Sequence, residues 1–182
     1  MRYLLLCVFF WGCEFSSSQP VPVNPSEDFQ SSTAGILLHS ENIRHLFISD
    51  RLEGLNTERD SLAESWLLLG SDPRFSPLSK EGHTAVLLFD ESKGLEMNRV
   101  VYSMMSEHLV NLMQAEPALQ EGFQIFECPM VEDYPYWVQP DGEMENPYMG
   151  LDMLSCGVSS EWESRPINSD DKTAYHTCPM HP

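Results

Sequence analysis

Sulfur-bearing side chains gather in three short stretches of this chain. Two lie within the sequence, away from its ends. One is a Cys-Pro-Met string that begins at Cys128, and the other is a Met-Leu-Ser-Cys string that ends at Cys156. The third is the closing sequence YHTCPMHP, which adds histidine to cysteine and methionine. Thiolates and thioethers are polarisable donors that favour copper(I) and silver(I), and a thioether binds without losing a proton. The candidate metal ligands are Cys128, Met130, Met153 and Cys156 in the interior and Cys178, Met180 and His181 at the end.

The same interior residues also allow a purely structural interpretation. In an oxidising compartment, Cys128 and Cys156 could form a disulfide that staples a segment poor in regular structure. Met130 and Met153 would then be ordinary apolar residues that fill gaps in the core. Residue types and spacing leave both interpretations open. If an ion is bound, we expect copper(I) or silver(I) rather than zinc.

The opening residues have the pattern of an export signal. Arg2 precedes an unbroken apolar run over residues 3–11, which is shorter than the roughly 20 residues needed to span a bilayer. Gly12 directly before Cys13 resembles the cleavage site of bacterial lipoproteins, in which the new N-terminal cysteine is acylated. We expect a signal peptide over residues 1–12, a flexible tether over residues 13–32, and a periplasmic or envelope protein held at the membrane by lipid on Cys13. Secretion without an anchor is the alternative.

The charge of the chain argues against one large class of partners. Asp and Glu outnumber Lys and Arg by 28 to 10, which gives a formal net charge of -18. Such a chain repels phosphate backbones, so we do not expect nucleic acid as a partner. The sequence also lacks a Gly-rich phosphate loop, a nucleophile elbow and a zinc-protease helix, so we expect a binding protein rather than an enzyme.

Residues 33–122 have the apolar spacing of helices, and their breaks fall at glycines and prolines. The spacing predicts a first helix within residues 33–55, a second that begins near Asn56 and ends at Gly70, a third over residues 79–92, and a fourth along the run from Met97 to Met113. The residues expected on the buried faces include Ile36, Ile43, Leu46, Phe47 and Leu55, then Leu62, Ala63, Trp66, Leu67 and Leu69, then Ala85, Leu88 and Phe89, and finally Met97, Val101, Met104, Met105, His108, Leu112 and Met113. Short connections between the helices favour a mainly α fold, an antiparallel four-helix bundle.

The character of the sequence changes after Gly122. Proline, glycine, tyrosine and tryptophan become frequent and no period persists, so we expect an irregular segment with a short strand over residues 123–128. Its aromatic residues should pack it on the helices. The predicted domain therefore covers residues 33–162, and the polar residues 163–182 form a flexible tail.

The irregular segment resembles a known family signature. The matching positions are Cys128-Pro129-Met130, Trp137, and Asn146-Pro147-Tyr148-x-Gly150-x-x-Met153-Leu154-x-Cys156-Gly157, with Arg99, Tyr102, Met105 and Ser106 on the helix before them. This pattern is similar to the C-terminal signature of a bacterial exported domain family of unknown function, found attached to periplasmic adaptors of copper/silver efflux pumps. The resemblance implies an exported helical domain in heavy-metal handling, with the Cys and Met positions as natural ligands.

The closing sequence carries a second resemblance. The string Cys178-Pro179-Met180-His181-Pro182 is similar to the opening of the short heavy-metal-binding domain of copper-resistance proteins. An extra residue separates Tyr175 from Cys178 here, and the motif is truncated at Pro182.

These observations lead to one functional expectation and one alternative. We expect an exported protein that binds copper(I) or silver(I), or passes it on, in envelope heavy-metal homeostasis, with an efflux adaptor or pump as partner. The alternative is a disulfide-stapled interaction module that docks on an efflux adaptor and binds no metal of its own.

Overall fold

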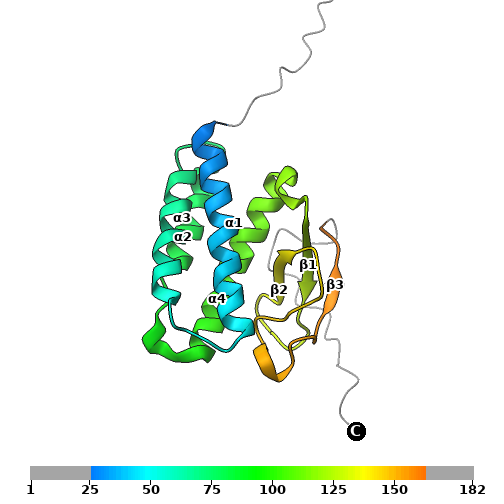
Figure 1. Cartoon of the computed structure of the whole chain (residues 1–182). Helices are drawn as coiled ribbons and strands as arrows, with labels where there is room; N and C mark the ends of the chain where they lie inside the picture. Colours follow the sequence, from blue (N-terminus) through cyan, green and yellow to red (C-terminus); the bar gives the residue numbers. More distant parts are fainter. Residues whose placement is uncertain (1–25, 163–182) are drawn as a thin grey trace, which may run out of the picture.

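The computed structural model describes residues 26–162. Within this range four α-helices are followed by a small antiparallel sheet of three strands (Figure 1). The helices are α1 (Glu27–Ile48), α2 (Leu55–Leu69), α3 (Ser76–Val86) and α4 (Gly94–Ala115), and the strands are β1 (Phe123–Glu127), β2 (Tyr136–Pro140) and β3 (Val158–Ser160). Consecutive helices pack against one another, and α4 also packs on β2. The prediction of a mainly helical chain is confirmed, and the sheet is an addition to it.

Helix α1 begins earlier than the sequence suggested. The Ser26 side chain accepts a hydrogen bond from the backbone N–H of Phe29 and so caps the helix, which starts at Glu27. Phe29 is buried and stacks on Phe75, with 5.3 Å between the ring centroids. Residues 27–32 were predicted to be part of the tether, but they belong to the folded domain. Ser32 donates its hydroxyl to the Phe29 carbonyl inside the helix.

The predicted buried faces need two corrections at helix ends. Helix α3 ends at Val86, not at residue 92, because Asp90 caps a separate 3-10 turn through the N–H of Ser92. The helical period therefore stops before Leu88, which is exposed, while Phe89 turns into the core. Leu67 on α2 is also exposed.

The long apolar face predicted for α4 is wider than the buried one. Val101, Met105, Leu109 and Leu112 are buried, whereas Met97 and Met104 lie exposed on another side of the helix. Helix α4 thus has apolar residues on two sides, and only one of them faces the core.

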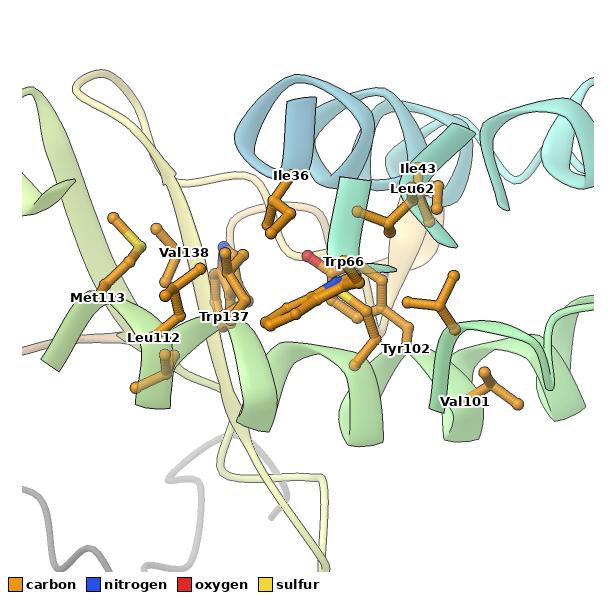
Figure 2. Close-up of a cluster of buried hydrophobic side chains, with 14 of the residues drawn as sticks. Ile36, Ile43, Leu62, Trp66, Val101, Tyr102, Leu112, Met113, Trp137 and Val138 are labelled. Carbon is orange, nitrogen blue, oxygen red and sulfur yellow. The ribbon is translucent and has the colours of Figure 1, made fainter. Parts of the chain in front are cut away.

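The core joins the helices to the sheet. Figure 2 shows side chains of α1, α2, α4 and β2 meeting in one cluster, among them Trp66, Tyr102 and Trp137. All three of these large side chains are almost completely buried. Trp137 and Tyr148 come from the segment expected to be irregular, so the prediction that aromatic residues pack this segment on the helices is confirmed.

The sheet has β1 at its centre, in the order β2-β1-β3. Both neighbours are antiparallel to β1, with Phe126 opposite Trp137 on β2 and opposite Ser159 on β3. The predicted strand over residues 123–128 is confirmed as β1. Strands β2 and β3 were not predicted, because Pro135 precedes β2 and Pro140 is its last residue, and because β3 covers only three residues.

Candidate metal centre

Each pair of candidate sulfur ligands spans one tight turn. The Cys128 carbonyl accepts a hydrogen bond from the Val131 N–H at 3.2 Å, which closes a turn that contains Met130. The Met153 carbonyl accepts from the Cys156 N–H at 3.0 Å, which closes a second turn. We call them the Cys128 turn (residues 128–131) and the Cys156 turn (residues 153–156).

The sheet register brings the two turns to the same place. Glu127, the last residue of β1, lies opposite Val158, the first residue of β3. The Cys128 turn follows β1 directly, and only Gly157 separates the Cys156 turn from β3. Since the strands are antiparallel, both turns lie at the same end of the β1–β3 ladder (Figure 1). Segments far apart in the sequence are therefore neighbours in the fold.

The four candidate ligands differ in depth. Cys128 is fully buried, with 0% of its surface exposed, and belongs to the hydrophobic core. Met130 is 52% exposed and Met153 is 40% exposed. Cys156 has intermediate exposure, and both cysteines are thiols in the structure. The ladder brings the two turns together, but it leaves Cys128 on the core side and the two thioethers at the surface.

Asn146 organises the Cys156 turn. Its side chain is completely buried, and its amide nitrogen Nδ2 donates to the Cys156 carbonyl at 2.5 Å. The amide oxygen Oδ1 accepts from the backbone N–H of Tyr148 at 2.8 Å and of Met149 at 3.2 Å. The Asn146 backbone N–H donates to the Leu154 carbonyl. Asn146 therefore holds the turn at two points, at Leu154 through its backbone and at Cys156 through its side chain.

Tyr148 ties this region to the sheet and to α4. Its hydroxyl donates to the Tyr136 carbonyl at 2.7 Å, and its ring meets those of Tyr102 and Trp137 edge to face. Burial raises the pKa of Tyr148 well above its ordinary value, and the nearby Tyr102, Tyr134 and Cys128 add to the shift. The hydroxyl therefore keeps its proton and remains a donor. Ser106 on α4 donates to the same Tyr136 carbonyl at 2.8 Å.

Arg99 on α4 holds the segment that precedes the Cys156 turn. Its guanidinium donates to the Pro147 carbonyl at 3.1 Å and pairs with Asp50 at 2.5 Å. Gly150 lies against this ion pair with φ of 57°, a left-handed conformation that disfavours a side chain. Several positions of the sequence signature therefore have structural roles: they lock the segment after β2 onto the helices.

A second ionic contact was not predicted from the sequence. Arg44 on α1 is buried, pairs with Glu41 at 2.8 Å, and donates to the backbone carbonyl of Glu145 at 3.2 Å. Burial alone would lower the pKa of Arg44, but the hydrogen bond and charge of Glu41 together with the effects of Tyr102 and Glu145 outweigh it, so this pKa is raised. The spacing of Glu41 and Arg44 on one helix is visible in the sequence, whereas nothing local indicates the contact with Glu145.

Residues 26–162 contain no group of three His, Cys, Asp or Glu side chains that could hold a metal ion, so any site at the two turns depends on the methionine sulfurs. No helix of this range is long and apolar enough to cross a membrane. Cys13, Cys178, Met180 and His181 lie outside the described residues, so lipidation of Cys13 and metal binding by the closing motif stay predictions.

No protein-family model, curated protein or solved structure matches this chain. The two resemblances drawn from the Cys-Pro-Met strings therefore stay predictions as well.

Proposed function

We propose that this protein is an exported binder of copper(I) or silver(I) that serves as a metallochaperone in heavy-metal homeostasis of the cell envelope. The observation that carries the proposal is the β1–β3 register, which places the Cys128 and Cys156 turns at one end of the ladder. Two thiols and two thioethers are the donor types that such ions prefer. In this account α1 to α4 act as an antiparallel bundle that supports the turns.

The depth of the donors suggests an order of binding. Met130 and Met153 are exposed and meet an arriving ion first, together with the half-buried Cys156. Cys128 then supplies a second thiolate from the core side. Because the thioethers bind without losing a proton, capture does not wait for ionisation of a thiol.

The remaining parts of the proposal concern the chain ends. Cys178, Met180 and His181 capture metal or hand it to an efflux adaptor or pump, and lipid on Cys13 holds the protein at the membrane. The support for these steps is the sequence of each motif, since the ends lie beyond the described residues.

The alternative function is an interaction module without metal, and one observation favours it. Asn146, Tyr148 and Arg99 use their polar groups to hold the loop segment on the helices, and Cys128 is part of the core. A Cys128–Cys156 disulfide would complete this role. The module would then dock on an efflux adaptor through its surface alone.

An anaerobic copper(I) titration against a competing chelator separates the two functions. We expect Cys156→Ser to weaken copper binding by about tenfold or more, which is ~1.4 kcal/mol or more of binding free energy. Met153→Leu, which removes a thioether at similar size, should weaken binding less. Met97→Leu on α4 is the matched control, since Met97 is also an exposed methionine but belongs to neither turn.

The closing motif needs its own variant. Cys178→Ser shows whether the tail contributes to the affinity, and it keeps the interior turns intact. If Cys178→Ser removes all copper binding while Cys156→Ser and Met153→Leu match the wild type, the interior site proposed here is wrong.

A further inference from the structure

A groove of about 450 Å³ runs between α3 and α4, on residues that have no part in the candidate metal centre. One wall carries Thr84 and Ala85 of α3 with Leu88 just beyond the helix, and the other carries Met104 and His108 of α4. The volume is within the range of ligand-binding clefts, which is about 300–1,000 Å³.

The groove continues an exposed apolar stripe along α4. Met97 is 53% exposed, Val100 is 52% exposed and Met104 is 41% exposed, and their spacing of three and four residues puts them on one side of the helix. Leu87 and Leu88 are exposed at the end of α3. Isolated apolar side chains on a surface are ordinary, but a stripe of them beside a groove is typical of a protein interaction site.

His108 lines the same groove with its imidazole ring. Its Nδ1 is buried and has no hydrogen-bond partner among the described residues. Burial lowers the pKa of His108, although Glu107 and Glu81 act in the opposite direction. The ring is therefore favoured in its neutral form and adds no charge to the apolar wall of the groove.

The charge of the whole chain, more than that of the groove itself, indicates the kind of occupant. Lys80 and Glu81 line the groove, Glu107 lies close to His108, and Lys93 donates to the Leu88 carbonyl, so the local charges balance. The whole chain carries a net charge of -18, so an anionic membrane surface would be repelled. A cationic partner would be attracted.

We propose that the α3–α4 groove binds an amphipathic helix of a partner protein, with large aliphatic residues on one face and Lys or Arg on its flanks. A helix laid in a groove uses anchors spaced three, four and seven residues apart, which suits the row from Met97 to Met104. Flexible methionine side chains adapt to such anchors. This inference is independent of the metal function.

Fluorescence anisotropy tests the proposal with the full-length chain and synthetic peptides. The probe is a labelled peptide of leucine and lysine whose order forms an amphipathic helix, and the control peptide has the same composition in an order without an apolar face. We expect only the amphipathic peptide to bind tightly. The Leu88→Asn/Met104→Asn variant should bind it about tenfold more weakly or worse, a loss of ~1.4 kcal/mol.

Two further variants make the test specific to this groove. Val100→Asn replaces one exposed apolar residue of the same stripe and should also weaken binding of the amphipathic peptide. Leu67→Asn changes an exposed leucine on α2, which is 65% exposed, and should leave binding unchanged. Equal binding of the two peptides, or equal losses in Leu67→Asn and the groove variants, would overturn the proposal. So would concentration-dependent self-association of the chain that the groove variants abolish, because the occupant would then be a second copy.

Discussion

Asn146→Ala is expected to lower the free energy of unfolding by about 3 kcal/mol, since three buried or partly buried backbone groups lose their partner and each such loss costs about 1 kcal/mol. The groups are the Cys156 carbonyl and the N–H groups of Tyr148 and Met149. The Cys156 turn should loosen, so the Cys156 thiol of the reduced protein should react faster with iodoacetamide. Urea unfolding and peptide mass spectrometry of the alkylated protein measure the two effects.

Asn42→Ala is the matched control. Asn42 donates one partly buried side-chain hydrogen bond to Glu58, so its loss should cost about 1 kcal/mol or less. It should also leave the alkylation rate of Cys156 unchanged. Equal destabilisation by the two substitutions would contradict the role of Asn146 in holding the turn.

Gly150→Ala is expected to lower the free energy of unfolding by about 2–4 kcal/mol. An alanine in the left-handed conformation costs about 1–2 kcal/mol at any site. At Gly150 the new methyl group would also overlap the Asp50 carboxylate and the Arg99 guanidinium, so the ion pair between α4 and the end of α1 must separate. Urea unfolding measures the loss.

Gly122→Ala separates the two causes of this loss. Gly122 has a positive φ of 79°, but nothing lies within 4 Å of the place where a methyl group would stand. It should therefore show the backbone cost alone. If both variants lose the same stability, contact with the Asp50–Arg99 pair does not explain the requirement for Gly150.

The helices could be predicted because their cause is local. Ile36, Ile43 and Phe47 recur at helical spacing and are all fully buried. The predicted burial was wrong at Leu88, where the apolar spacing continues beyond the end of α3. It was also wrong at Met104, because α4 has apolar residues on two sides. Apolar spacing shows which residues share a face of a helix. It does not show whether that face packs into the core.

The sheet and the locking contacts could not be predicted because they join distant segments. Strand β3 exists through its pairing with β1, and its three residues carry no periodic pattern. The pairs Cys128–Met130 and Met153–Cys156 were recognisable as candidate ligands from residue type. Their common location follows from the register of β1 and β3, and the burial of Cys128 follows from core packing, which no spacing in the sequence indicates.

The central claim is that Cys128 and Cys156 are thiols that receive a soft metal ion. Alkylation with iodoacetamide followed by mass spectrometry of the non-reduced, exported protein tests it most directly when done before and after anaerobic loading with copper(I). The account predicts that both cysteines are alkylated when the metal-free protein is unfolded, and that in the folded protein bound copper slows the alkylation of the half-buried Cys156. Recovery of Cys128 and Cys156 as a disulfide-linked peptide pair, with no copper taken up by the interior site, would contradict it.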